Sequence, residues 1–477
     1  MNQNAERKQY LDKFLETHFY QFWRGNYNKN RRFLRLPKLE MIITPYCNLG
    51  CKYCYMHHYG KDLYPENIRD KEEIIENARV LTEWFIKNRF TPSTIELFSG
   101  SLFTQDTSWA VLEEIYQAYS SCEKELRPSV ITAPTNLTFL LDERLIEKVE
   151  DVITRFKEIG IYFHLSGSLE GKYMEQNRPF KNNLETGEEH GNFLYTPDNR
   201  EPRDDEYYNR VFEFCKKWGY GFHPMVSAYD IDKWKDNFLW FQEMFKKYDM
   251  PYHKIFLLEV RNERWTDEEL RHFYEFSRFL WNWYYEYFSG DKNKIYSLIQ
   301  GGGNKQGINW VTSFLGVKKS AGIPCSIQDD MQIRLGDLSW VMCHRMSYDG
   351  YQFAKFKKRN GMIVDIEPHN VDMMTALYSM DTSNAPGCMT CPIKSLCNYF
   401  CLGSNLETVG DPMIPNPRVC ELNHVKVAGN IQGLKDIDMF DCIDCVEPEV
   451  YQALRYIDNT YNTENFGGMK FHGRITK

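Results

Sequence analysis

The 477-residue chain has no surplus of positive charge, since 58 Lys and Arg residues stand against 66 Asp and Glu residues, a formal net charge of −8. Nucleic-acid-binding proteins usually carry a basic domain, so this balance argues against a nucleic-acid partner. No stretch approaches the roughly 18 uninterrupted apolar residues that predict a membrane span. The segment that starts at Met1 also has no apolar core of the kind found in signal peptides.

Cysteine, by contrast, is abundant, with fourteen residues in the chain. Without an export signal, such a number predicts metal or redox chemistry in a reducing cytoplasm rather than disulfides. Nine of the fourteen lie from Cys325 onward, so the C-terminal third differs in character from the rest.

The first group of cysteines is Cys47, Cys51 and Cys54, spaced C-x-x-x-C-x-x-C directly after the apolar stretch Met41-Ile42-Ile43. Three thiolates on one tight loop can bind three irons of a four-iron, four-sulfur cluster. The fourth iron then has no protein ligand and is open for chemistry. A zinc site is the alternative, but structural zinc sites usually combine two close ligand pairs, and no second pair is nearby.

This loop resembles the cluster-binding loop of radical S-adenosylmethionine (AdoMet) enzymes, in which Tyr53 fills a position that is usually aromatic. The resemblance implies that the open iron chelates the amino and carboxylate groups of AdoMet. It also implies that one electron from the cluster cleaves the sulfonium to give a 5′-deoxyadenosyl radical.

Strand candidates alternate with amphipathic helical segments between residues 38 and 264, which predicts βαβ units with a parallel sheet. Six such units make a partial (β/α)6 TIM-like barrel, whose sites lie at the C-terminal ends of the strands. The strand candidates are Leu39–Ile43, Ile95–Phe98, Val130–Ala133, Ile161–Ser166, Tyr220–Ser227 and Ile255–Val260. A charged excursion over about 179–205 interrupts the pattern and is equally consistent with a peptide clamp and a solvated loop.

The expected domains are an N-terminal helical extension (1–37, with a helix over about 6–23), the partial barrel (38–264), a bridging helix and linker (265–324), a cysteine-rich domain (325–425) and a C-terminal tail (426–477). The bridging helix is expected to begin with a capping box at Thr266 and Glu269.

The cysteine-rich part resembles the SPASM domain, a C-terminal module of radical AdoMet enzymes that usually carries two auxiliary iron–sulfur clusters. The resemblance implies an outer cluster on Cys388, Cys391, Cys397 and Cys420, and an inner cluster on Cys325, Cys343 and Cys401. A zinc ribbon is the alternative; it would employ four of these cysteines and leave three without a role.

The inner set lacks one cysteine that full SPASM domains have. The inner cluster is therefore open, takes an oxygen ligand from Asp329 or Asp330, or borrows from Cys442 and Cys445; alternatively it is absent or a two-iron form.

The same resemblance implies an AdoMet pocket. Ser99, Gly100 and Ser101 stand where the family has a Gly-Gly-Glu segment, although the glutamate is missing. Thr135-Asn136 resembles a Thr-Asn-Gly motif. Ser168-Leu169-Glu170-Gly171 with Arg178 resembles a Ser-x-Asp-Gly…Arg stretch that contacts AdoMet, an arginine being a bidentate partner for a carboxylate. Val226 would face the adenine. Surface-loop and core roles are the alternatives for Arg178 and Val226.

The resulting hypothesis is a cytoplasmic, anaerobic radical AdoMet enzyme of the peptide-maturase kind, with AdoMet and three iron–sulfur clusters. It would abstract hydrogen from a peptide or protein, and it would take electrons from a flavodoxin or ferredoxin. Asp329, Asp330 and His344 are candidates for the general base. Two alternatives remain: a SPASM-type dehydrogenase or epimerase of a small molecule, and a non-catalytic or electron-transfer relative.

Overall fold

The computed structural model describes residue 9 and residues 34–56, 63–64, 70–181, 203–300, 308, 330–378, 380, 382, 384–397, 400–445 and 448–461. These residues belong to two compact units, the first drawn from 1–168, 178–214 and 326–379 and the second from 169–177, 215–325 and 380–477. None of the described helices is both long and apolar enough to cross a membrane. The predicted helix over about 6–23, most of the charged excursion, Cys325 and Asp329 lie outside the described residues.

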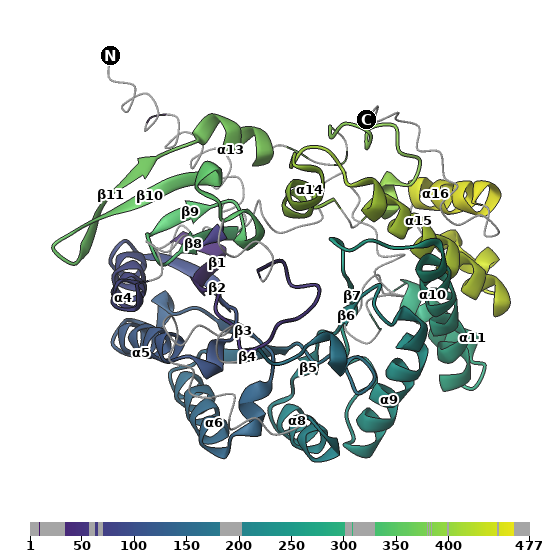
Figure 1. Ribbon diagram of the computed structural model, residues 1–477, viewed down its shortest axis with the longest axis horizontal. Coiled ribbons are helices and arrows are strands. Elements are labelled where there is room, and N and C mark those ends of the chain that lie inside the picture. The colour runs from purple at the N-terminus through teal and green to yellow at the C-terminus, as the bar shows by residue number, and fades with distance from the viewer. Residues whose placement is uncertain are drawn as a thin grey trace. The chain divides into compact units, whose positions relative to one another are not determined.

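A parallel sheet forms the core of the first unit (Figure 1). Leu39, Met41, Ile95 and Leu97 are completely buried, and Ile42 on the opposite face of the first strand is completely buried too, as is usual for strands of a parallel sheet that is covered on both faces. The strands are β1 (Leu34–Thr44), β2 (Phe90–Ser99), β3 (Val130–Thr135) and β4 (Tyr162–Gly167), alternating with helices α4 (Lys71–Lys87), α5 (Asp106–Ser120) and α6 (Glu143–Glu158). The alternation confirms the predicted α/β class with a parallel core of the partial-barrel kind.

The sheet of the first unit continues on the other side of β1. Strand β8 (Asp330–Arg334) pairs parallel with β1, and β9 (Ser339–Val341), β10 (Gln352–Arg359) and β11 (Met362–Pro368) follow as antiparallel neighbours, before helix α13 (Val371–Tyr378). All five residues of β8 are buried. Strands from beyond residue 325, where the sequence places the start of a separate domain, therefore belong to the same sheet as β1.

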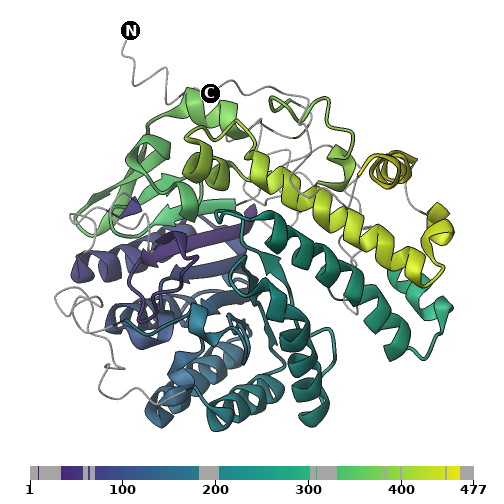
Figure 2. The ribbon, with the colours of Figure 1, turned by 45° about the vertical axis from the view of Figure 1, so that its right-hand side comes forward.

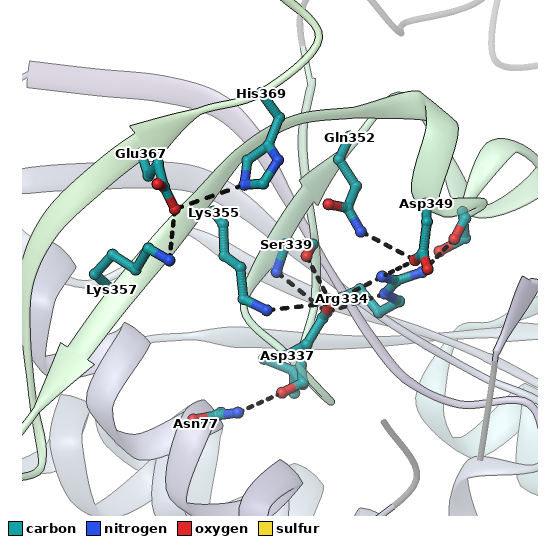
Figure 3. Close-up of polar contacts among 12 residues, drawn as sticks. Asn77, Arg334, Asp337, Ser339, Asp349, Gln352, Lys355, Lys357, Glu367 and His369 are labelled. Carbon is teal, nitrogen blue, oxygen red and sulfur yellow. Dashed lines mark hydrogen bonds and ion pairs between the residues drawn. The ribbon is translucent and has the colours of Figure 1, made fainter. Parts of the chain in front are cut away.

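A buried guanidinium with two carboxylate partners holds these added strands together (Figure 3). The Arg334 guanidinium is only 1% exposed and lies 2.8 Å from an Asp337 oxygen and 2.9 Å from an Asp349 oxygen. Ser339 donates to Asp337 at 2.7 Å. A buried guanidinium without such partners would destabilise the fold, so this network fixes the conformation of the β8–β9 turn.

Among the described residues, the second unit is mainly helical and contains three short strands. Its helices are α9 (Trp234–Lys247), α10 (Asp267–Tyr287), α11 (Lys292–Gln300), α14 (Leu402–Val409), α15 (Pro417–Asp436) and α16 (Pro448–Thr460); α8 (Asp205–Trp218) begins in the first unit and ends in the second. The predicted capping box of Thr266 and Glu269 at the start of α10 is confirmed.

Helices α10 and α15 lie side by side (Figure 2). Their backbones approach closely because α15 carries glycine at the contact: a Cβ on Gly429 would lie 2.5 Å from the carbonyl oxygen of Tyr274, and one on Gly433 would lie 2.8 Å from that of Arg278. Trp281 also donates to Asn430 at 2.8 Å.

The last predicted strands are much shorter than their apolar runs suggest. The run over 220–227 yields only β5 (Gly221–Phe222) and β6 (Met225–Val226), and the run over 255–260 yields β7 (Leu258–Glu259), which pairs parallel with β6. Pro224 lies between β5 and β6, and proline interrupts a strand because it has no N–H to donate.

Candidate functional site

The three-cysteine loop, residues 45–54, begins where β1 ends, and Cys47, Cys51 and Cys54 are each half-buried. The turn after β2 supports its first residues. Gly100 donates from its N–H to the Thr44 carbonyl at 2.9 Å, and a Cβ at this position would lie 2.3 Å from the carbonyl oxygen of Tyr46. Only glycine permits this approach, so β2 fixes the path of the chain into the loop.

The carboxamide of Asn136, directly after β3, reaches the same loop. Its nitrogen lies 3.6 Å from Cys47 Sγ, 2.8 Å from Asn48 Oδ1 and 3.3 Å from Ser101 Oγ. Asn48 in turn donates to Thr138 at 2.9 Å. The ends of β1, β2 and β3 therefore meet at Cys47, as expected for parallel strands whose C-terminal ends form one edge.

A second segment pairs with the loop through its backbone. We call residues 178–181 the loop-pairing segment. Gly50 N–H donates to the Pro179 carbonyl at 2.8 Å, and Lys181 N–H donates to the Asn48 carbonyl at 3.0 Å. Arg178 within it is only 3% exposed. The sequence predicts a functional Arg178, but nothing in the local pattern indicates this pairing or a role for Lys181.

The electrostatics of Cys47 combine opposing effects. Burial raises the pKa of the Cys47 thiol, and neighbouring Cys51 raises it further. The backbone N–H of Leu49, which lies 3.4 Å from Cys47 Sγ, lowers the pKa, as do the charges of Lys181 and Arg178.

These surroundings fit an iron–sulfur cluster. A thiol that binds metal must lose its proton, and hydrogen bonds and cations directed at the sulfur stabilise that thiolate. Cys47, Cys51 and Cys54 would be its ligands.

The predicted AdoMet-binding residues in the first unit lie around this loop or at the adjoining strand ends. Ser99 is 7% exposed, and its hydroxyl has no hydrogen-bond partner among the described residues. Ser101 is 2% exposed, and its hydroxyl lies 2.5 Å from that of Thr104. Ser168 follows β4 and donates from its N–H to the Thr135 carbonyl at 2.8 Å. Tyr53 is half-buried within the loop.

Leu137 follows Thr135-Asn136 at the position where the resembling motif has glycine. Its φ of 63° is in the left-handed region, which leucine adopts at a cost. Gly167 makes room for it, since a Cβ there would lie 2.9 Å from Leu137 Cδ1.

Two predicted pocket residues belong to the second unit. Val226 is completely buried on β6. Glu170, which replaces the expected Asp, accepts the N–H of Met225 at 2.9 Å, while Asn237 donates to the Glu170 carbonyl at 2.7 Å. The Glu170 side chain therefore fixes the start of β6.

The candidate bases Asp330 and His344 lie in a buried polar network of the first unit. Lys38 Nζ is 3.2 Å from Asp330 and 2.5 Å from Glu96. His344 Nδ1 is 2.8 Å from Glu40, and its ring stacks on Phe98 with centroids 4.4 Å apart. Asp330 thus has a cationic partner near the beginning of β8.

Glu40 is the member of this network that sequence reasoning missed. It is 1% exposed; burial would raise its pKa, but His344 and Lys38 lower it below its usual range. The charged positions Lys38 and Glu40, next to the apolar run Met41-Ile42-Ile43 of β1, were the available signal.

In the second unit, Cys388, Cys391, Cys397 and Cys420 influence one another electrostatically. Burial raises the pKa of Cys388 to about 12, with contributions from Cys397 and Cys391. Burial likewise raises the pKa of Cys420, followed by the effects of all three other thiols. These are the four cysteines predicted for an outer cluster.

Two cysteines of the predicted inner set, Cys401 and Cys343, are among the described residues. Cys401 caps α14, where its sulfur accepts the N–H of Ser404 at 3.4 Å. Cys343 is buried after β9, in the first unit. Cys442 is exposed.

Across the described part of the chain, no three His, Cys, Asp or Glu side chains are arranged to hold a metal ion. In a cubane each cysteine binds a different iron, so the thiols stand farther apart than the ligands of one ion.

A carboxyl that the sequence analysis overlooked lies after β7. Glu263 accepts the hydroxyl of Ser227 at 2.7 Å and the N–H of Ala228 at 2.8 Å. Burial raises the pKa of Glu263 to about 7. No cation is among the groups that shift the Glu263 pKa in the described part of the chain. Its position in the sequence, after a short strand in a charged stretch, gave no signal.

Residues 41–182 match the family model of the radical SAM superfamily. No curated protein matches the chain. Three similar solved structures are polyhistidine-tagged anSMEcpe with bound AdoMet (TM-score 0.54, 14% identity, 88% of this chain and 98% of that chain covered), native anSMEcpe with bound AdoMet (0.52, 13%, 88% and 99%), and native anSMEcpe with bound AdoMet and Cp18Cys peptide (0.50, 14%, 88% and 100%). At these identities the likeness shows the fold alone.

Proposed function

We propose that this chain, which carries a radical AdoMet domain in residues 41–182, abstracts hydrogen from a peptide or protein substrate. The observation that carries the proposal is the half-buried three-thiol loop at the end of β1, with hydrogen-bond donors and cations directed at Cys47. The peptide substrate is supported by the anSMEcpe structure that contains a bound peptide.

The radical AdoMet domain implies a [4Fe–4S] cluster and AdoMet, which together supply the 5′-deoxyadenosyl radical when bound. Cys47, Cys51 and Cys54 would ligate the cluster. Asn136 would hold Cys47 and Asn48 in position through its carboxamide. Gly100 would keep the loop against the end of β2.

The AdoMet-binding residues that we propose are Tyr53, Ser99, Gly100, Ser101, Ser168, Arg178 and Val226. The free hydroxyl of Ser99 suits an ammonium donor, which needs oxygen acceptors. The buried guanidinium of Arg178 suits a carboxylate.

We further propose an outer auxiliary cluster on Cys388, Cys391, Cys397 and Cys420, supported by their mutual influence in the second unit. The inner set of Cys325, Cys343 and Cys401 stays a prediction. The auxiliary clusters would accept the electron that leaves a substrate radical, and a flavodoxin or ferredoxin would supply electrons to the enzyme.

A net oxidation also releases a proton, so a base is required. His344 is the best placed of the proposed bases. Its Nδ1 is hydrogen-bonded to the Glu40 carboxylate, so Nε2 is the ring nitrogen that would accept a proton. Asp330 is already paired with Lys38. Asp329 stays a candidate from the sequence.

The test is anaerobic reconstitution with iron and sulfide, followed by incubation with AdoMet and dithionite. We expect 5′-deoxyadenosine to form, and we expect its formation to increase with the cognate peptide. Reconstituted protein that binds iron but yields no 5′-deoxyadenosine would instead support the non-catalytic alternative. Stimulation by a small alcohol or amine, but by no peptide, would support the small-molecule alternative.

A further inference from the structure

The loop-pairing segment carries two positive charges to the three-cysteine loop. Its backbone forms one hydrogen bond to Gly50 and one from Lys181 to Asn48, so residues between the first two cysteines are held directly against it. The stem of Lys181 follows this path, since its Cγ would lie 3.5 Å from a Cβ on Gly50. Both Lys181 and Arg178 act electrostatically on Cys47.

The segment is also held from its other side. Arg203 donates to the carbonyl of Arg178 at 2.6 Å, and its guanidinium lies 4.6 Å from the ring centroid of Phe180. Arg203 thus adds two contacts to the two hydrogen bonds made by the loop. The backbone of the segment is therefore fixed at both ends, which keeps the base of the Lys181 side chain beside the three-cysteine loop.

We propose that the positive charge of Lys181 raises the reduction potential of the cluster on Cys47, Cys51 and Cys54. This inference rests on the proposed function, because it requires that cluster. Reduction adds one electron, and hence one negative charge, to the cluster. A nearby cation stabilises the reduced form more than the oxidised form, and partial burial limits screening by water.

Two substitutions separate the charge from the packing. Lys181→Met keeps the long stem and the backbone pairing but removes the charge, whereas Lys181→Arg keeps the charge. The matched control is Lys157→Met, which removes an exposed charge from α6 of the same unit.

The experiment is an anaerobic redox titration of the reconstituted full chain with dithionite, followed by electron paramagnetic resonance. The signal of the loop cluster is identified by subtracting the Cys47→Ala, Cys51→Ala, Cys54→Ala triple variant. At a fixed potential, we expect the ratio of reduced to oxidised cluster to fall about three- to tenfold in Lys181→Met, where tenfold corresponds to about 59 mV for one electron. Lys157→Met and Lys181→Arg should match the unmodified chain.

Equal ratios in Lys181→Met and Lys157→Met, with the loop cluster present, would overturn the inference and leave the proposed function intact. A ratio in Lys181→Arg as low as that in Lys181→Met would also overturn it, because packing rather than charge would then be responsible. Absence of any loop-cluster signal in the unmodified chain would contradict the proposed function itself.

Discussion

In the first unit, the three-cysteine loop is attached to strand ends, with Asn136 from β3 and the turn after β2 bonded to it. In the second unit, Cys388, Cys391 and Cys397 lie on successive backbone turns: Cys391 N–H donates to the Cys388 carbonyl at 3.0 Å, and Cys397 N–H to that of Lys394 at 3.2 Å. The first group is positioned by a sheet, whereas the second depends on local turns.

The two cysteine groups also differ in how far neighbouring donors and cations offset the effect of burial on the thiol pKa. Burial and Cys51 raise the pKa of Cys47, and a backbone N–H with two cations offsets part of that rise. For Cys420, burial and the other three thiols all raise the pKa. In the second group, burial raises the pKa of Cys391, and the backbone N–H of Ile393 and the charge of Lys394 offset part of this. Thiols with so little compensation are stabilised chiefly by the metal that binds them, because coordination removes their protons. We therefore expect the surroundings of the first group to influence the properties of the cluster it binds. We expect the turns of the second group to depend on their metal for local structure.

The largest expected effect follows from removing the first group. The Cys47→Ala, Cys51→Ala, Cys54→Ala triple variant should lose 5′-deoxyadenosine formation completely, because no thiolate remains to hold the AdoMet-binding cluster. It should also lose about four irons per chain while retaining the others. Iron analysis and product chromatography test this. Retained cleavage would show that the reactive site lies elsewhere.

The reciprocal change tests the second group. A Cys388→Ala, Cys391→Ala variant should also lose about four irons, but it should still form 5′-deoxyadenosine without substrate. Because the second group depends on its metal, this variant should be cleaved faster by protease around residues 385–400. The control is Cys122→Ala, a cysteine outside both groups. Loss of one zinc instead of iron would favour the zinc-ribbon alternative.

An intermediate effect is expected from removing one buried asparagine in each unit. Asn136→Ala removes the donor to Cys47 and Asn48, and should reduce AdoMet cleavage about tenfold while iron content stays near that of the unmodified chain. Asn405 is the matched residue in the second unit: it is 3% exposed, donates to the Pro412 carbonyl at 3.0 Å and accepts the N–H of Asn416 at 3.1 Å.

Asn405→Ala should cost about 1–3 kcal/mol in the free energy of unfolding, but should leave AdoMet cleavage unchanged. Urea titration of both variants measures the free energy of unfolding, and 5′-deoxyadenosine formation measures AdoMet cleavage. If Asn405→Ala lost cleavage as strongly as Asn136→Ala, the specific role of Asn136 in supporting the three-cysteine loop would be contradicted.

Local patterns in the sequence were sufficient for the parts of the molecule that depend on near neighbours. The spacing of Cys47, Cys51 and Cys54 after an apolar run placed the loop at a strand end, and Thr266 with Glu269 located the start of α10 correctly. Contacts between distant segments left no such pattern. The pairing of β8 with β1 joins residues about 290 positions apart, as Lys38 and Asp330 show.

The same limit applies to the site. The backbone pairing of Lys181 with Asn48 uses no side-chain donor, so residue types do not reveal it. The apolar run over 220–227 predicted one strand, but a single missing N–H at Pro224 divides it. Glu263 is surrounded in sequence by ordinary charged residues, and only its burial distinguishes it.

The smallest expected effect compares the buried carboxyl of Glu40 in the first unit with the half-buried carboxyl of Glu263 in the second. Glu263 has a pKa of about 7 because of burial, so between its usual value and pH 7 the folded chain keeps a proton that the unfolded chain has lost. Its contribution therefore favours folding at low pH and declines as pH rises. From about pH 5 to pH 8, the free energy of unfolding of the unmodified chain should fall by about 1–2 kcal/mol relative to that of Glu263→Gln.

The pH dependence expected for Glu40 has the opposite sign. His344 and Lys38 lower its pKa against the effect of burial, so its contribution to stability is present at neutral pH and is lost as pH falls below the usual carboxyl range. Urea unfolding of the unmodified chain, Glu263→Gln and Glu40→Gln at about pH 3.5, 5 and 8 tests both signs together, and a pH dependence of the same sign for the two residues would contradict the assignment of one paired and one unpaired carboxyl.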